Sequence, residues 1–201
     1  MQISGDGTTC SQIPFRQSLA TLANARRDGD LVVTNMGSSR VWPLIENHRL
    51  DFHFNPSTMG GAVPLAMGIA LAQPERTVIA LSGDGSLLMS LGSLVSVVSA
   101  RCTNLSIILL DNSVYDVTGG QKTAASDSNV RFDEMARSIG FETVVTFHDA
   151  QSWQDQATSF LQSSGPGFCW LKVEPARPED MKTRQEPMRL QVDRIRRELA
   201  K

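Results

Sequence analysis

The chain has 201 residues, 41% hydrophobic and 20% charged, which is typical of one folded domain and not of a disordered, fibrous or membrane protein. The 19 basic and 21 acidic residues give a net charge of -2, and the basic residues are mostly scattered, which argues against nucleic acid as a partner. The three cysteines, Cys10, Cys102 and Cys169, lie too far apart for a metal motif or a disulfide framework. Residues 1–17 contain no leader pattern, so we expect a cytoplasmic protein that is neither exported nor membrane-spanning.

Short apolar runs alternate with helical patterns along the chain. Runs rich in β-branched residues predict buried strands at 31–35, 77–82, 105–111, 143–147 and 168–173. Helical patterns occupy 15–27, about 131–138 and about 150–162, and one further helical face is formed by Leu87, Leu91, Leu94, Val95 and Val98. Strands separated by helices predict an α/β fold with a doubly wound, mostly parallel sheet and helices on both faces.

The remaining segments define the expected domain boundaries. We expect a disordered N-terminus at 1–13, one domain at 14–175, and a linker with a C-terminal amphipathic helix at 176–201. That last helix either packs on its own domain or clasps a partner. The helix expected at 60–72 is apolar all round, so it requires a cover on every side, which a second subunit could complete.

An aspartate between two glycines closes the apolar run at 77–82. Ligands bind outside the carboxyl ends of parallel strands, so Asp84 is placed to hold a hard cation while the backbone N–H groups of Gly85 and Ser86 face a phosphate. Mg²⁺ needs further oxygen ligands, and Asn112 follows Gly85 after 26 intervening residues, at the end of the next strand. One βαβ unit therefore predicts that Asp84 and Asn112 lie side by side.

The same tripeptide also occurs where it predicts nothing. Gly5, Asp6 and Gly7 precede Asn35 by a similar distance, but no apolar strand leads into that copy, so we assign it to a disordered terminus. The spacing is informative only in the context of a strand and a helix.

Four segments in the same order resemble one family. The motif that joins Gly83, Asp84 and Gly85 to Asn112, together with residues 37–40, 57–72 and 110–121, resembles the diphosphate-binding half of thiamine diphosphate-dependent 2-oxoacid decarboxylases. Within that family the resemblance is to the sulfopyruvate decarboxylase β subunit and to the matching half of phosphonopyruvate decarboxylase. It covers about residues 14–175 and implies the thiamine diphosphate-binding fold.

The resemblance assigns roles to the motif residues. It implies that the Asp84 carboxylate, the Asn112 side chain and the Val114 carbonyl ligate Mg²⁺, which bridges to the diphosphate, while Gly85 and Ser86 hold phosphate oxygens. The complete set of cofactor-binding residues that it implies is Gly37, Ser38, Ser39, Ser57, Thr58, Met59, Gly83, Asp84, Gly85, Ser86, Asn112, Val114 and Tyr115.

Several of these positions have more specific implied roles. Met59 matches the apolar residue that bends the cofactor into its reactive V shape, Ser57 would offer its carbonyl to the 4′-amino group, and Tyr115 would border the thiazolium ring. Ser38 matches a diphosphate-binding hydroxyl. For Ser38 and Ser39 a helix cap is an alternative interpretation that stays open.

The implied activity is decarboxylation of a short anionic 2-oxo acid to an aldehyde and CO₂. Arg40 or Lys122 could contact a sulfonate or phosphonate, although a solvated surface position suits both, and His53 is either near the site or structural. The chain is long enough for only one of the two domains that the family uses. We therefore expect a hetero-oligomer, with a pyrimidine-domain α subunit that supplies the catalytic glutamate at the interface.

Other functions share parts of this pattern. An acetolactate synthase-like carboligase would use the same cofactor site, and a non-catalytic magnesium–diphosphate binding module would need only this half. A 2-oxoacid:ferredoxin oxidoreductase β subunit has a similar turn at 118–121, but the cluster-binding cysteines are missing. A receiver-type signalling domain needs an acidic pair near its first strand, and residues 31–39 are uncharged.

Overall fold

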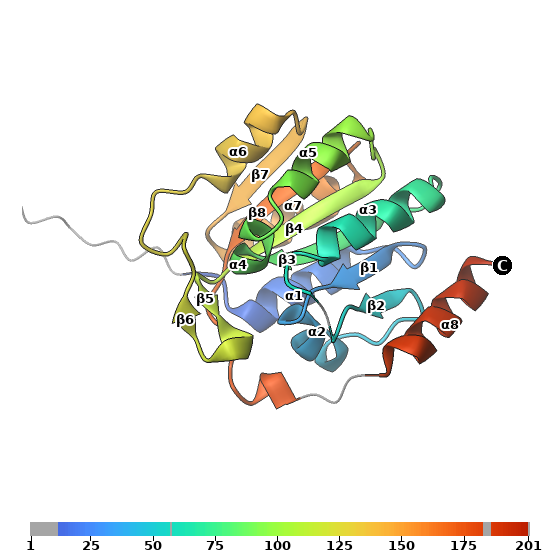
Figure 1. The fold of residues 1–201 in the computed structure, drawn as a ribbon, viewed down its shortest axis with the longest axis horizontal. Coiled ribbons are helices and arrows are strands. Elements are labelled where there is room, and N and C mark those ends of the chain that lie inside the picture. Colours follow the sequence, from blue (N-terminus) through green and yellow to red (C-terminus); the bar gives the residue numbers. More distant parts are fainter. Residues whose placement is uncertain (1–11, 57, 183–185, 201) are drawn as a thin grey trace, which may run out of the picture.

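The computed structural model describes residues 12–56, 58–182 and 186–200, which form an α/β structure built on one parallel sheet (Figure 1). The strands lie in the order β2, β1, β3, β4, β8, β7, and neighbouring strands run parallel. Their bounds are β1 (Leu31–Thr34), β2 (Asp51–His53), β3 (Val78–Gly83), β4 (Leu105–Asp111), β7 (Thr143–Phe147) and β8 (Gly167–Lys172). A separate antiparallel hairpin consists of β5 (Val114–Tyr115) and β6 (Gln121–Lys122).

Helices cover both faces of the sheet, which confirms the predicted doubly wound fold (Figure 1). The α-helices are α1 (Phe15–Ala25), α2 (Ser38–Val41), α3 (Ala62–Ala72), α4 (Asp84–Leu88), α5 (Gly92–Ser99), α6 (Phe132–Ile139), α7 (Ala150–Gln162) and α8 (Met188–Leu199). Short 3-10 turns are η1 (Trp42–Leu44), η2 (Asp116–Thr118) and η3 (Asp180–Lys182). None of the helices in the described ranges combines the length and the hydropathy that a membrane span requires.

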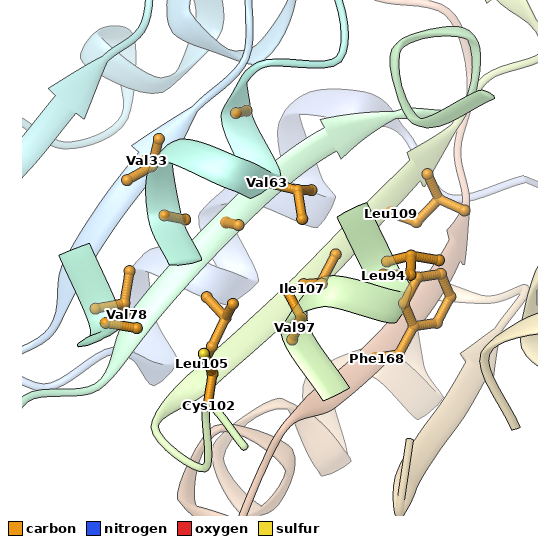
Figure 2. Packing of buried hydrophobic residues seen from close by; sticks show 14 of the residues in the cluster. Val33, Val63, Val78, Leu94, Val97, Cys102, Leu105, Ile107, Leu109 and Phe168 are labelled. Atoms are coloured by element: carbon orange, nitrogen blue, oxygen red, sulfur yellow. The ribbon is translucent and has the colours of Figure 1, made fainter. Parts of the chain in front are cut away.

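Two hydrophobic clusters lie on opposite sides of the sheet. In β3, Val78 and Ala80 belong to the cluster covered by α3, α5 and α6, whereas Ile79 and Leu81 belong to the cluster covered by α1 and α7. Successive side chains of a strand point to opposite faces, so a strand covered on both faces is apolar throughout. Figure 2 shows the first cluster, in which strand residues such as Ile107 face the helices above them.

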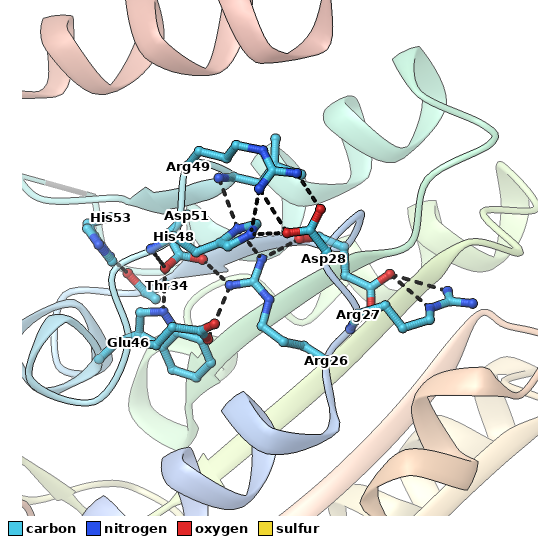
Figure 3. Close-up of polar contacts among 12 residues, drawn as sticks. Arg26, Arg27, Asp28, Thr34, Glu46, His48, Arg49, Asp51 and His53 are labelled. Atoms are coloured by element: carbon cyan, nitrogen blue, oxygen red, sulfur yellow. Dashed lines mark hydrogen bonds and ion pairs between the residues drawn. The ribbon is translucent and has the colours of Figure 1, made fainter. Parts of the chain in front are cut away.

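The edge strand β2 is one that the sequence did not predict. Its three residues include Asp51 and His53, which are polar and yet buried. The Asp51 carboxylate accepts hydrogen bonds from Trp42 Nε1 at 2.8 Å and from the backbone N–H of His48 at 3.1 Å, and it also pairs with Arg26 (Figure 3). Long-range polar partners therefore replace the apolar pattern by which the other strands were recognised.

Both ends of the described chain belong to the packed structure. Ile13 is fully buried and its backbone bridges to Val173, so the expectation of a disordered N-terminus through residue 13 is wrong at this residue; residues 1–11 lie outside the described chain. At the other end, α8 packs against β2 through the buried Gln191 and Ile195. Of the two alternatives for the last helix, packing on its own domain is the one observed.

The helix predicted from Leu87 to Val98 is interrupted. It forms α4 and α5, separated at residues 89–91, where the Ser90 hydroxyl donates a hydrogen bond to the Gly60 carbonyl at 2.9 Å. The break changes the phase of the buried face, so Val97 is buried and Val95 is exposed, contrary to the predicted spacing. In helix α3, Leu71 is 53% exposed, so this chain alone leaves part of that apolar helix uncovered, and the expected cover by a second subunit stays a prediction.

The connections around β1 and β3 define where a ligand fits. After β1 the chain passes through η1, whose Trp42 lies in the cluster with α1 and α7, to reach β2. After β3 it passes through α5, on the opposite face, to reach β4. Because the two connections leave in opposite directions, a crevice opens between the carboxyl ends of β1 and β3.

Candidate functional site

A cavity lies at the carboxyl ends of β1, β3 and β4, where the topology places a crevice. The space between its walls is about 750 Å³, which includes a part open to solvent. The residues that line it come from the loops after these strands, from the segment before α3, from α1 and from the β5 hairpin. They are Phe15, Asn35, Met36, Gly37, Ser38, Phe54, Thr58, Met59, Ala62, Gly83, Asp84, Gly85, Ser86, Leu110, Asn112, Val114, Tyr115, Asp116, Val117 and Thr118.

Most of the predicted site residues line this one cavity. Those that do are Gly37, Ser38, Thr58, Met59, Gly83, Asp84, Gly85, Ser86, Asn112, Val114 and Tyr115. The structure thus brings Asp84 and Asn112 together, as the spacing predicts, while their roles as ligands stay predictions. Ser39 is not among the lining residues, and Ser57 lies outside the described part of the chain.

Asp84 is a buried carboxylate at the junction of β3 and α4. It is 1% exposed, and its Oδ2 accepts a hydrogen bond from Thr123 Oγ1 at 2.5 Å. The pKa of Asp84 is raised to about 6, chiefly by burial; the Thr123 hydroxyl opposes the rise by stabilising the ionised form, and the nearby Asp111 adds to it. The residues described as lining the cavity include no lysine, arginine or histidine, so the cavity wall supplies no cationic side chain to Asp84.

Asn112 is held at both ends of its side-chain amide. Its Nδ2 donates to Asp116 Oδ2 at 2.5 Å, and its Oδ1 accepts from the Val114 backbone N–H at 3.1 Å. The carboxylate of Asp116 also accepts from the backbone N–H of Ala176, at 3.2 Å. The amide therefore has a defined orientation within the turn that follows β4.

A second buried aspartate, Asp111, stabilises the same turn after β4 through hydrogen bonds. Oδ1 of Asp111 accepts from the backbone N–H and the hydroxyl of Ser113, at 3.2 and 3.1 Å, and Oδ2 accepts from Trp170 Nε1 at 2.9 Å and Lys172 Nζ at 2.6 Å. Ser113 has a φ of 61°, a left-handed conformation that is uncommon for serine. These four bonds hold the backbone on either side of Asn112.

Glycine is required at position 85 by a close contact with the hairpin. A Cβ added there would lie 2.2 Å from the ring of Tyr115, so no larger residue fits unless that ring moves. The neighbouring Ser86 hydroxyl accepts from the Gly60 backbone N–H at 2.8 Å, which ties the start of α4 to the segment before α3. Gly85 and Ser86 line the cavity together with Tyr115.

Ser38 and Asn35 exchange hydrogen bonds after β1. The Asn35 Oδ1 accepts from the Ser38 backbone N–H at 3.0 Å and from its hydroxyl at 2.6 Å, and Ser38 Oγ accepts from the Asn35 N–H at 3.1 Å. The Ser39 hydroxyl donates to the Met36 carbonyl at 2.9 Å. Both hydroxyls bond within the turn that begins α2, but neither caps the helix: Gly37 is the N-cap residue and has no side-chain cap bond, and the side chain that accepts from the Ser38 N–H is that of Asn35.

Three residues with open roles lie away from the cavity wall. His53 is buried beside Thr34, with 3.2 Å between Nδ1 and Oγ1, and burial lowers the pKa of its imidazole, as in a structural histidine (Figure 3). Arg40 donates to the Met181 carbonyl at 3.1 Å, and the largely exposed Lys122 pairs with Asp127 at 2.8 Å. None of the three is among the residues that line the cavity.

Sequence reasoning missed several contributors to this site. Asn35, which entered the sequence analysis only through a chance spacing, lines the cavity, as do Phe15 and Phe54. Thr123 contacts Asp84, and Asp116 contacts Asn112, from beyond the motif. An asparagine at the carboxyl end of a predicted strand, as Asn35 is in 31–35, was a usable signal, whereas the contacts of Thr123 and Asp116 depend on the hairpin fold.

Residues 34–170 match the family model described as the C-terminal TPP binding domain of thiamine pyrophosphate enzymes. The chain belongs to this family. A phosphonopyruvate decarboxylase from Streptomyces viridochromogenes is 34% identical over 77% of this chain and 38% of its own length. The sulfopyruvate decarboxylase subunit beta of Methanothermobacter thermautotrophicus is 38% identical over 74% of this chain and 76% of its own length.

A solved structure of the family supports the fold. An X-ray structure of a putative thiamin diphosphate-dependent enzyme from Mycobacterium smegmatis superposes with a TM-score of 0.68 and 22% identity, over 81% of this chain and 32% of that one. The chain therefore spans most of a beta subunit but only about a third of the longer family members.

Proposed function

We propose that this chain is the diphosphate-binding subunit of a magnesium- and thiamine diphosphate-dependent decarboxylase, which converts a short anionic 2-oxo acid to an aldehyde and CO₂. The observation that carries the proposal is the meeting of Asp84 and Asn112 in one cavity at neighbouring strand ends, in a chain of the thiamine pyrophosphate family. Relatives named sulfopyruvate and phosphonopyruvate decarboxylase support a substrate of the same chemical class.

The residues present fit a hydrated divalent cation. Mg²⁺ takes oxygen ligands and usually one or two carboxylates, which suits the Asp84 carboxylate, the Asn112 amide oxygen and the Val114 carbonyl. The raised pKa of Asp84 shows a buried carboxylate that no cationic side chain of the lining compensates, and a metal ion would provide that compensation.

The residues also fit a diphosphate next to that cation. Gly85 and Ser86 lie in the first turn of α4 and line the cavity, so their backbone N–H groups are our candidates to hold phosphate oxygens. Gly37 and Ser38 line the facing wall, after β1. When bound, thiamine diphosphate supplies the electron sink that allows a 2-oxo acid to lose CO₂.

The chain's own side chains would shape the rest of the pocket. Met59, with Phe54 and Tyr115, gives the wall an apolar part that excludes water and supports a bent cofactor. We assign Met59 the role of enforcing that shape, and we assign the carbonyl of Ser57 to the pyrimidine amino group on the strength of the family resemblance alone.

A second subunit completes this proposal. Relatives of similar length carry the name subunit beta, and we infer that a pyrimidine-domain α subunit supplies the glutamate that this half lacks. Leu71 on α3, Met89 after α4 and Val95 on α5 are each more than half exposed, and they suit its docking. Because the lining residues include no basic side chain, we assign recognition of the sulfonate or phosphonate to that partner.

One alternative is favoured by a specific observation. The large subunit of acetolactate synthase isozyme 1 from Escherichia coli is 26% identical over 82% of this chain, so a carboligase would share the cofactor site described above. The two activities differ in their product: an aldehyde from the decarboxylase, and an acetohydroxy acid from the carboligase.

The test is co-expression with the candidate α subunit, followed by product analysis with sulfopyruvate, phosphonopyruvate and pyruvate. We expect aldehyde and CO₂ from the complex in the presence of Mg²⁺ and thiamine diphosphate, and no turnover by this chain alone. An Asp84→Ala complex is the inactive control. Turnover by the isolated chain, or an acetohydroxy acid as the main product, would overturn the proposal.

A further inference from the structure

We propose that Asp116 is a positioning residue for the metal site, because its carboxylate sets the orientation of the Asn112 side-chain amide. The inference rests on the proposed function, in which the Asn112 oxygen is a ligand of Mg²⁺. Asp116 is the first residue of η2 and lies outside the motif that joins Gly83, Asp84 and Gly85 to Asn112.

The orientation of an asparagine side chain decides whether it can bind a metal. The two ends of the amide are nearly the same size, but only the oxygen has lone pairs for Mg²⁺, and the NH₂ group would place hydrogens toward the cation. Rotation of Asn112 by half a turn would therefore remove a ligand without changing the shape of the cavity.

Asp116 distinguishes the two ends of the amide by hydrogen bonding. Its Oδ2 lies 2.5 Å from Asn112 Nδ2 and 3.2 Å from the backbone nitrogen of Ala176. A backbone N–H can only donate, so Oδ2 is an acceptor, and the amide end that faces it must be the NH₂ group. The oxygen is consequently turned to the other side, where it accepts from the Val114 N–H at 3.1 Å.

The carboxylate of Asp116 is itself anchored. The bond from Ala176 ties it to the segment after β8, whereas Asn112 follows β4, so the orientation depends on two neighbouring strands of the sheet. The backbone between them is held by Asp111 through Ser113. Asp116 thus acts through Asn112 and has no need to touch the metal.

The experiment compares Asp116→Ala with Asp116→Asn in the full chain. Mn²⁺ replaces Mg²⁺ as the probe, and free Mn²⁺ is measured by electron paramagnetic resonance in the presence of thiamine diphosphate. The side-chain NH₂ signals of Asn112 are followed by ¹⁵N NMR in the metal-free protein and identified by their loss in Asn112→Asp. Asp155→Ala is the matched control, because that aspartate accepts from the Gln151 side-chain amide on an exposed helix face.

We expect Asp116→Ala to weaken Mn²⁺ binding about 10–100-fold, the usual effect of losing a group that orients a metal ligand, and to move the Asn112 signals toward those of a solvated amide. Asp116→Asn keeps an acceptor oxygen and should restore most of the affinity, and Asp155→Ala should change neither readout.

Two results would overturn the inference. Equal losses of Mn²⁺ affinity in Asp116→Asn and Asp116→Ala would show that the charge of Asp116, and not its hydrogen bond, matters. Unchanged Asn112 signals in Asp116→Ala would show that Asp116 does not hold the amide. If neither the wild-type chain nor its complex with the α subunit binds Mn²⁺ with thiamine diphosphate, the proposed function fails, while the metal-free NMR comparison still decides whether Asp116 orients Asn112.

Discussion

The buried carboxylate of Asp84 is expected to destabilise the metal-free protein, so Asp84→Asn should stabilise it. Burial raises the pKa of Asp84 from its ordinary value of 3.8 to about 6. The folded state therefore binds the proton more tightly than the unfolded chain, and stability is lost as the pH rises from about 4 to about 6. At about 1.4 kcal/mol for each tenfold change in proton affinity, the cost above pH 6 is about 3 kcal/mol.

Asparagine removes this cost and can still accept the hydrogen bond from Thr123. We expect the melting temperature of the metal-free Asp84→Asn variant at pH 8 to exceed that of the wild type by about 6–12 °C, as a difference of this size implies for a domain of this length. The difference should shrink below pH 6 and vanish near pH 4. Added Mg²⁺ and thiamine diphosphate should raise the wild-type melting temperature and leave that of the variant unchanged.

The assay is thermal unfolding followed by circular dichroism, with a chelator present, between pH 4 and pH 8. Asp155→Asn is the control, because its exposed carboxylate should contribute little at any pH. An Asp84→Asn variant that is no more stable than the wild type at pH 8, or whose advantage does not depend on pH, would refute the reasoning.

Two further predictions concern packing and ion pairing. Gly85→Ala should cost about 1–3 kcal/mol of stability and weaken cofactor binding in a calorimetric titration, because its Cβ would overlap the ring of Tyr115; an unchanged affinity would contradict the proposed close approach at this backbone. Asp51→Ala should cost about 3–5 kcal/mol in urea unfolding, since it removes the fully buried one of the two carboxylates that pair with Arg26 and leaves only Glu46, at 3.4 Å (Figure 3). The control is Asp28→Ala, which breaks the exposed ion pair between Asp28 and Arg49. Equal losses of stability in Asp51→Ala and Asp28→Ala would show that burial of the pair is not the cause.

Much of the fold follows from local patterns in the sequence. The predicted strand at 105–111 coincides with β4, because a parallel strand covered on both faces is largely apolar. The predicted strand at 143–147 coincides with the edge strand β7, whose β-branched and aromatic residues are typical of strands. The edge strand β2 lacks that pattern. Its polar residues are buried by partners far away in sequence, such as Gln191, whose side chain accepts from the His53 backbone N–H at 2.7 Å. No local pattern encodes such a pairing.

For the proposed metal site, too, one part follows from the sequence and another only from the tertiary structure. Sequence alone predicted that Asp84 and Asn112 meet, because a βαβ crossover brings one strand tip beside the next whatever the details of packing. Only the tertiary structure decided what holds them: Thr123 on Asp84 and Asp116 on Asn112. Crossover geometry is a property of the backbone and can be read from spacing, whereas hydrogen-bond partners depend on where the β5 hairpin folds back, and that is settled only when the whole chain packs.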